Sequence, residues 1–377
     1  MLRDSLLPEG AGRHVEQVEI VFAGEISSDR VIPAWRETVA RTEALRINFA
    51  TGAGETALLG PIDFLRIEEV LPDSWPSWLD ADRMRPLLIP DDVPWRAVYW
   101  PLSGHLIWTF HHALLDGRSV ARVLRGFLER VAGGTAEDLA LAKWSEPTPA
   151  ALALAQDIFR ESFVDLEPSE FASNTETSSA GQALCCLGND FAARLEMMAT
   201  TMDLTTATLL TWAWGQALAE ASNADAVMVE QVRAGIPQHG TAGFTMITLP
   251  IMIHRTGGAS VRENLREFRT HLLALRAIET VSPSDFPPGI FPDMDRPGGS
   301  VIMVEHGTLR QMTGKVAQEK WIESLVLHEA KGESLTATAH ILPDLQLEVE
   351  GPGRHRLLVK WAGVLKKLLS PGRELQP

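Results

Sequence analysis

The stretch HLIWTFHHALLDGRS, residues 105–119, decides the fold because it joins a strand, a turn and the start of a helix. Its first half is rich in β-branched and aromatic residues, and a PLSG turn separates it from a second such run at 95–100, which predicts a β-hairpin. Asp-Gly at 116–117 favours a tight turn. Residues 119–134 then repeat apolar side chains at helical spacing and end in two glycines, which predicts an amphipathic helix.

Two histidines end the predicted strand, and an aspartate and a glycine follow within one turn. Because successive side chains of a strand point to opposite faces, His112 shares the face of Trp108 and His111 takes the other face. Burial on an apolar face keeps an imidazole neutral, which is the form that a general base needs. Taken alone, a histidine pair beside Asp-Gly is more often core packing and a turn than a catalytic site, and both interpretations stay open at this point.

Composition excludes several classes of protein. The 377 residues carry 34 Lys and Arg against 49 Asp and Glu, a net charge of −15. Such an acidic chain is unsuited to binding phosphate backbones or to a polybasic membrane anchor, so we expect no nucleic acid and no membrane partner. The only cysteines, Cys185 and Cys186, are adjacent, which excludes a disulfide framework and a cysteine zinc site. No metal site is predicted, and the absence of a leader-like or spanning segment favours the cytoplasm.

Strands and helices alternate in similar amounts in both halves of the chain, which predicts an α/β (α+β) protein of two lobes. We expect an N-terminal lobe at 1–145 that carries HHALLDG, a linker with a helix at 146–182, and a C-terminal lobe at 183–377.

Three motifs carry a family resemblance. HHALLDG at 111–117 resembles the HHxxxDG signature of the chloramphenicol-acetyltransferase-like acyltransferase superfamily, and most closely that of nonribosomal peptide synthetase condensation domains. RTEALRINF at 41–49 is similar to the RHExLRTxF pattern of these domains, with threonine in place of the usual histidine. GFTMITLP at 243–250 is similar to their GxFxNTLP segment, with isoleucine in place of asparagine. The order and spacing of the motifs fit over roughly residues 15–370.

The resemblance implies two chloramphenicol-acetyltransferase-like lobes in a V-shaped pseudo-dimer, with a central tunnel for donor and acceptor. It implies that His112 is the catalytic residue, supported by His111 and Gly117. The motif's Asp116 would form a structural ion pair with an arginine. Arg233 is the first choice for that partner and Arg46 the second.

The activity that the resemblance implies is acyl transfer from a coenzyme A or carrier-protein thioester to an amine or hydroxyl, in natural-product biosynthesis. No cofactor would be bound permanently, since the acyl-CoA or phosphopantetheinyl thioester is a substrate. We expect a stand-alone monomer with a small-molecule acceptor, and either free coenzyme A or a carrier protein as the donor's carrier. Family members begin with an extra segment that this chain lacks, so we expect part of the tunnel to be trimmed.

Further residues are candidates for the site. The backbone N–H near Gly117, or Thr248, would stabilise the oxyanion, and Trp108 would line the tunnel. Three arginines on the predicted helix would meet the phosphates of coenzyme A or phosphopantetheine, although a solvated helix face is the more common explanation of such a row: Arg118, Arg122 and Arg125.

Two alternatives remain. A catalytically degenerate domain that docks a carrier protein or partner enzyme would also carry these motifs, and the substitutions in the second and third motifs favour it. Epimerisation domains share the histidine motif and add a glutamate base four residues before the arginine. Glu230 lies three residues before Arg233 and would face the other side of a strand, which disfavours an epimerase.

Overall fold

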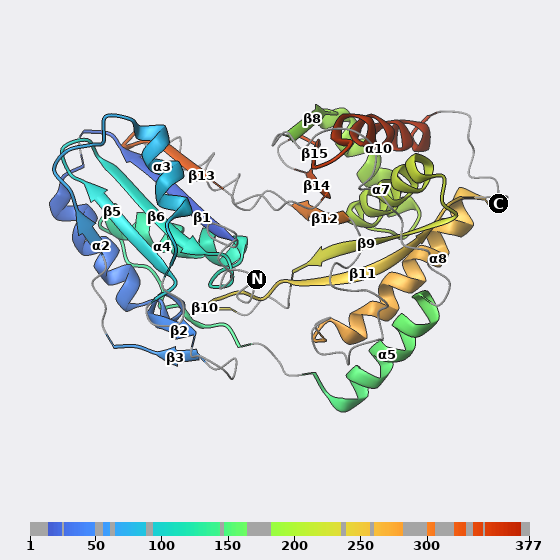
Figure 1. Cartoon of the computed structure of the whole chain (residues 1–377), viewed down its shortest axis with the longest axis horizontal. Coiled ribbons are helices and arrows are strands. Elements are labelled where there is room, and N and C mark those ends of the chain that lie inside the picture. The colour runs from blue at the N-terminus through green and yellow to red at the C-terminus, as the bar shows by residue number, and fades with distance from the viewer. Residues whose placement is uncertain are drawn as a thin grey trace. The chain divides into compact units, whose positions relative to one another are not determined.

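The chain forms two compact units in a computed structural model (Figure 1). The second half of the predicted linker lies outside the residues that the structure describes. The described residues are 14–24, 26–49, 56–60, 65–87, 93–143, 147–163, 182–234, 239–256, 260–281, 300–305, 320–328, 335–341 and 344–370.

The two units are not contiguous in sequence. The first comprises residues 1–143, 236–245 and 308–332, and the second comprises the rest. The sequence prediction placed 236–245 and 308–332 in the C-terminal lobe and was wrong there. Both segments contribute strands that hydrogen-bond within the first unit, and β13 appears in orange beside the blue and cyan strands of that unit in Figure 1. Local sequence cannot reveal such long-range pairing.

A five-stranded sheet in the order β13-β1-β6-β5-β4 organises the first unit. All neighbours are antiparallel except β4 and β5, and the register sets Val18 opposite Trp108. The predicted hairpin is the β5–β6 pair. The larger elements are β1 (Val15–Phe22), β4 (Leu65–Ile67), β5 (Trp95–Trp100), β6 (His105–His111), β13 (Ile322–His328), α2 (Ser28–Ala40), α3 (Trp75–Met84) and α4 (Gly117–Val131). The short elements are η2 (Glu43–Arg46), β2 (Ile47–Phe49), β3 (Thr56–Leu58), β7 (Ala140–Leu141) and β10 (Thr241–Ala242).

The core of the first unit lies between one face of the sheet and helices α2 and α4. Trp35 of α2 packs edge-on against Trp108 of β6 and Phe127 of α4, with ring centroids 5.6 and 5.2 Å apart. Such aromatic pairs add about 0.5–1.5 kcal/mol beyond the area they bury. The predicted amphipathic helix is confirmed as α4, because its apolar stripe is buried in this core.

The opposite face of the sheet carries a buried carboxylate. Asp82 of α3 accepts hydrogen bonds from Thr109 of β6 at 2.6 Å and from Gln17 of β1 at 3.1 Å. Its other oxygen accepts from Arg96 at 2.9 Å and from Arg85 at 3.0 Å. A carboxylate out of water is tolerated only with such partners. The network therefore fixes α3 on the middle of the sheet.

A six-stranded mixed sheet in the order β11-β9-β12-β14-β15-β8 organises the second unit. Its strands are β8 (Gln182–Cys186), β9 (Ala226–Arg233), β11 (Ile247–His254), β12 (Ser300–Glu305), β14 (Leu335–His340) and β15 (Gln346–Glu350). Its helices are α5 (Pro149–Phe163), α6 (Asn189–Thr201), α7 (Thr206–Ser222), α8 (Val261–Ala274), η3 (Leu275–Ile278) and α10 (Arg354–Leu368). The helix predicted inside the linker is α5.

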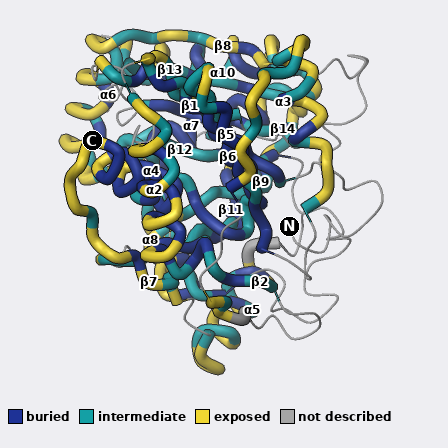
Figure 2. The backbone as a smooth tube through the Cα atoms, turned by 90° about the vertical axis from the view of Figure 1, so that its left-hand side faces the viewer, coloured by how far each residue is buried: buried dark blue, intermediate teal, exposed yellow. Residues whose placement is uncertain are grey.

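Helix α7 is the central helix of the second core. Trp214 of α7 packs against Trp361 of α10 with centroids 5.2 Å apart, and its indole N–H donates to Ser300 at 2.9 Å. Gly215 lies against Ile253, where a Cβ would approach to within 2.4 Å, so only glycine lets the helix come this close to β11. Figure 2 shows strand β11 as largely buried and the outer helices with exposed sides.

Within the described part of the chain, no helix is long and apolar enough to cross a membrane. The same residues contain no group of three or more histidine, cysteine, aspartate and glutamate side chains placed to hold a metal ion. Cys185 and Cys186 lie on β8 as free thiols, the second of them exposed.

Candidate functional site

The HHALLDG motif forms the turn between β6 and α4 in the first unit. Strand β6 ends at His111, and the His112 N–H donates to the carbonyl of His14 at 2.6 Å, which continues the pairing with β1. Asp116 is the N-cap of α4, and its carbonyl accepts from the Val120 N–H at 2.9 Å. The sequence folds in this way because Asp is a strong N-cap and Gly117 starts the helix without a side chain to bury.

His112 lies against a carboxylate and an aromatic ring. Its Nδ1 is 2.9 Å from Oε1 of Glu16 on β1, an ion-pair contact in which the histidine side chain is 20% exposed and that of Glu16 is 11% exposed. The imidazole meets the ring of Phe244 edge-on, with centroids 5.3 Å apart. A carboxylate at Nδ1 favours a proton on that nitrogen and leaves Nε2 as the basic atom.

Glu16 was missed by sequence reasoning, although a signal was present. The even-numbered positions of β1, Val18, Ile20 and Phe22, face the apolar core, and Glu16 continues that row as a carboxylate. Its register partner is Phe110, two residues before His112. A glutamate in line with a buried apolar stripe needs a partner, and the adjacent strand supplies one.

His111 has a different environment from its neighbour. Only 1% of the residue is exposed, and its Nδ1 accepts a hydrogen bond from the Ala113 N–H at 3.0 Å. Burial, and to a smaller extent the charges of His14 and His112, lowers the pKa of His111 to about 3. His111 is thus a neutral acceptor that fixes the turn. The sequence argument expected burial to neutralise His112, whereas the structure finds this effect at His111.

The Asp116 carboxylate joins the motif to the segment that resembles the third family motif. One oxygen accepts from the Ser119 N–H at 2.9 Å, and the other accepts from the N–H and hydroxyl of Thr245 at 3.1 and 2.7 Å. Ser119 also exchanges hydrogen bonds with the backbone of Gly243, at 2.8 and 3.1 Å. The Asp116 residue is 2% exposed, so these donors replace water around its charge.

The predicted ion pair of Asp116 with Arg46 is wrong, and the pair with Arg233, which lies in the second unit, stays a prediction. Arg233 donates to Glu279 at 2.7 Å, and Arg46 donates to the Leu59 carbonyl at 3.2 Å. Burial lowers the pKa of Arg233 and the Glu279 carboxylate opposes that shift. The physical reason for the error is that neutral donors can satisfy the hydrogen-bonding capacity of a buried carboxylate without a cation. Motif position alone cannot distinguish the two.

Gly117 opens the first turn of α4. Of the described atoms, none outside its chain neighbours and its own helix lies within 4 Å of the position that a Cβ would take, so the backbone is open to a ligand here. The first N–H groups of a helix have no intrahelical acceptor and carry partial positive charge. A developing oxyanion would be stabilised at this position.

Other predicted residues separate into core and surface positions. Trp108 is 1% exposed and packs in the core against Trp35 and Phe110, so the tunnel-lining role predicted for it is wrong. Its place in an apolar strand could not distinguish a core from a channel, because both require an apolar side chain. Thr248 lies on β11 of the second unit, half-buried and opposite Val232, and its oxyanion role stays a prediction.

The three predicted phosphate-binding arginines differ from one another. Arg122 donates to the carbonyl of Thr241 at 2.7 Å and so has a structural contact within the first unit. Arg118 is half-buried and Arg125 is exposed. Their role toward a phosphate stays a prediction.

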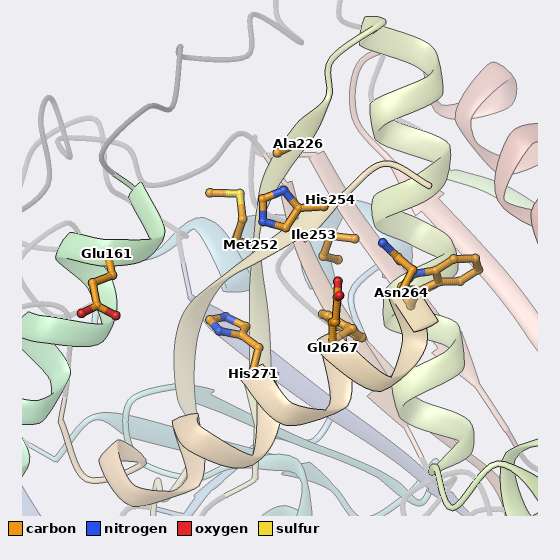
Figure 3. A pocket seen from close by; sticks show the side chains of 10 residues that line it. Glu161, Ala226, Met252, Ile253, His254, Asn264, Glu267 and His271 are labelled. Carbon is orange, nitrogen blue, oxygen red and sulfur yellow. The ribbon is translucent and has the colours of Figure 1, made fainter. Parts of the chain in front are cut away.

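A cavity of about 440 Å³ lies in the second unit, away from any predicted residue (Figure 3). Its wall combines apolar side chains such as Met252 with the imidazoles of His254 and His271 and the carboxylates of Glu161 and Glu267. Burial lowers the pKa of His271, as do the charges of Arg233 and His254. Glu230 on β9, raised to a pKa of about 7 by burial, is another perturbed acid of this unit.

We predict that His111 makes stability depend on pH. Its folded pKa is depressed below the unfolded value, so its contribution is complete above about pH 6.5 and is lost as pH falls toward 3. The slope contributed is up to about 1.4 kcal/mol per pH unit. His111→Asn keeps an acceptor for Ala113 but does not titrate. Urea unfolding at pH 7, 6 and 5 should therefore give a shallower pH slope for the variant, and parallel slopes would contradict the assignment.

We also predict that Asp116 stabilises the fold through Thr245. Asp116→Asn keeps a helix cap but turns an amide toward the Thr245 donors, which should cost about 1–3 kcal/mol of unfolding free energy. Thr245→Val, which removes only the hydroxyl, should cost less. A double-mutant cycle of Asp116→Asn with Arg46→Gln should show coupling near zero, and strong coupling there would restore that ion pair.

Comparisons with known proteins agree with the motifs. No family model matches the chain. A linear gramicidin synthase polypeptide of Brevibacillus parabrevis is 26% identical over 316 residues, which is 74% of this chain and 4% of that protein. Nonribosomal peptide synthetase 30 of Fusarium vanettenii is 21% identical over 306 residues, 73% of this chain and 5% of that protein. The chain thus spans a small fraction of the curated relatives it matches.

Solved structures extend the similarity over nearly the whole chain. A condensation domain of the enacyloxin polyketide synthase, described in connection with chain release, matches 99% of this chain and 81% of its own with a TM-score of 0.71 at 18% identity. The first condensation domain of the calcium-dependent antibiotic (CDA) synthetase gives 0.71 at 16% identity, over 99% and 95%. The starter condensation domain of rhizomide synthetase, in complex with C8-CoA, gives 0.70 at 12%, over 98% and 91%. The resemblance predicted from the motifs is confirmed at the level of the fold: this chain has the fold of the condensation domains of nonribosomal peptide and polyketide synthetases.

Proposed function

We propose that this chain is a condensation-type acyltransferase that moves an acyl group from a thioester to an amine or hydroxyl. The observation that carries the proposal is the 2.9 Å contact between Nδ1 of His112 and Oε1 of Glu16. The carboxylate favours a proton on Nδ1, which makes Nε2 the basic nitrogen. His112 lies in the turn that leads into α4, a helix whose N-terminus favours negative charge. The condensation-domain fold and the binding of an acyl-CoA by one structural neighbour support this choice of chemistry.

The proposed reaction uses His112 first as a base and then as an acid. Nε2 of His112 takes the proton of the acceptor's N–H or O–H as the acceptor attacks the thioester carbonyl carbon. The N–H groups at the first turn of α4, beginning at Gly117, stabilise the oxyanion that forms. The C–S bond then breaks, and the proton passes from His112 to the leaving thiolate. The products are an amide or ester and a free thiol.

The donor is proposed to be coenzyme A or a phosphopantetheinyl carrier protein. One structural neighbour is a starter condensation domain in complex with C8-CoA, and another is a four-domain nonribosomal peptide synthetase. Coenzyme A thioesters and carrier-protein thioesters are therefore the two donors to test with this chain. The acceptor is a small amine or alcohol.

We predict that His112→Ala lowers turnover by about 10²- to 10⁴-fold, because a positioned general base contributes that much. The assay incubates the full chain with a panel of acyl-CoAs and amines and measures released thiol. The free thiols Cys185 and Cys186 give a background that an enzyme-only blank subtracts. His111→Asn is the matched control and should keep activity at pH 7.5.

Turnover of His112→Ala within threefold of wild type would show that the base is assigned wrongly. If wild type releases no thiol above the His112→Ala level but binds a carrier protein, the chain is the degenerate docking domain instead.

We predict that Glu16→Gln lowers kcat by about tenfold or more, equivalent to about 1.4 kcal/mol, with little change in KM. The carboxylate stabilises the imidazolium that forms only during the reaction, so the loss falls on the chemical step. Glu16→Asp should recover part of the activity. An unchanged kcat in a folded Glu16→Gln protein would remove Glu16 from the mechanism.

A further inference from the structure

A second cavity in the second unit has a basic wall. It has a volume of about 440 Å³ and lies between the end of α6 and one side of α8. Three arginines of α8 line it, together with Thr201, Asp203 and Thr270. The chain as a whole carries a net charge of −15, so a concentration of cations around one hollow is unusual for its surface.

The three arginines form one stripe because of their spacing. Arg262, Arg266 and Arg269 are four and three residues apart on α8, which places their side chains on the same side of a helix. Sequence reasoning did not single out this pattern. It is visible in VRENLREFR as arginine at the helical repeat, beside the row that includes the buried Leu265 and Phe268.

Acidic neighbours neutralise only part of this charge. Arg269 donates to Asp203 at 2.5 Å, and Asp203 is the only acidic residue that lines the cavity among the described residues. Glu263, on the same helix, accepts hydrogen bonds from the N–H and hydroxyl of Ser260, which lower its pKa more than the nearby charge of Arg266 does. The lining therefore keeps a net charge of two positive units.

Arg262 and Arg266 are available for an external anion. Neither forms an ion pair or hydrogen bond with another side chain of the described part of the chain. The threonine hydroxyls are occupied, because Thr201 donates to the Met197 carbonyl at 2.8 Å and Thr270 to the Arg266 carbonyl at 3.1 Å. The donors that face an incoming ligand are thus guanidinium groups.

Guanidinium groups in a concave site match phosphate oxygens. Each group presents parallel N–H donors that bind phosphate or carboxylate in a bidentate way. Two such groups side by side suit two linked anionic centres better than a single carboxylate. The volume lies within the range of about 300–1,000 Å³ that is typical of small-molecule sites.

We propose that this cavity binds a phosphate-bearing small molecule through Arg262 and Arg266, with a diphosphate as the preferred group. The site belongs to the second unit and is independent of the chemistry proposed for His112. The chain as a whole is acidic, and the local positive potential of this cavity attracts such a ligand to it.

Isothermal titration of the full chain with inorganic pyrophosphate at low ionic strength tests the proposal. We expect saturable binding by wild type and at least tenfold weaker binding by the double variant Arg262→Gln/Arg266→Gln. The matched control is Lys366→Gln/Lys367→Gln, which removes the same charge from exposed positions of α10, another helix of the second unit that does not line the cavity. Circular dichroism verifies that both variants are folded.

Each result has a defined meaning. Loss in the α8 variant with retention in the control supports the proposal. Absence of saturable binding by folded wild type, or equal loss in both variants, overturns it. Citrate binding as tightly as pyrophosphate would also overturn it, since that would indicate a general attraction for anions. Titration with coenzyme A, compared with pantetheine, then shows whether the phosphate belongs to the thioester carrier. These binding results do not depend on turnover, so they stand whether or not the His112 mechanism holds.

Discussion

The geometry of the candidate site depends on one buried carboxylate. Asp116 caps α4 through Ser119 and, with its second oxygen, holds Thr245 from a segment more than a hundred residues away. The hydrogen bonds to Thr245 fix the neighbouring Phe244, whose ring lies against the ring of His112. Without these donors, the buried charge would lower the free energy of unfolding by several kcal/mol. The donors around Asp116 are therefore as necessary to the structure of the motif as the motif's own residues. The family signature describes a folded junction of three segments.

The adjacent histidines show how one residue type takes two roles within one turn. His111 is enclosed and accepts a backbone hydrogen bond, so the neutral form is enforced by its surroundings. His112, one residue on, reaches the opposite side, retains some exposure and has a carboxylate beside it. Because successive side chains of a strand point to opposite faces, two adjacent histidines can take a structural and a chemical role. Their roles could not be exchanged without inverting the sheet.

Local features of this fold were predictable from sequence, and long-range partners were not. The β5–β6 hairpin, the turn and the amphipathic α4 follow from periodicity and turn residues, and the condensation-domain resemblance followed from three motifs. The sequence could not show that Thr245 donates hydrogen bonds to Asp116, nor that Glu16 on β1 contacts His112. Each of these contacts joins strands or loops brought together only by sheet register. Trp108 illustrates the same limit, because a core and a channel require the same apolar residue. The V-shaped arrangement and its tunnel stay predictions.

The chain alternates between the two units, and this affects how it folds while it is being synthesised. Six successive segments belong in turn to the first and second units, so the chain passes from one unit to the other five times. Strand β1 is synthesised early, yet its edge partner β13 begins only at Ile322. Until then that edge presents unpaired backbone groups, which is the condition that promotes association between nascent chains. Neither unit can be cut out as one continuous fragment, and a truncation after residue 143 would leave the first sheet with a permanently open side.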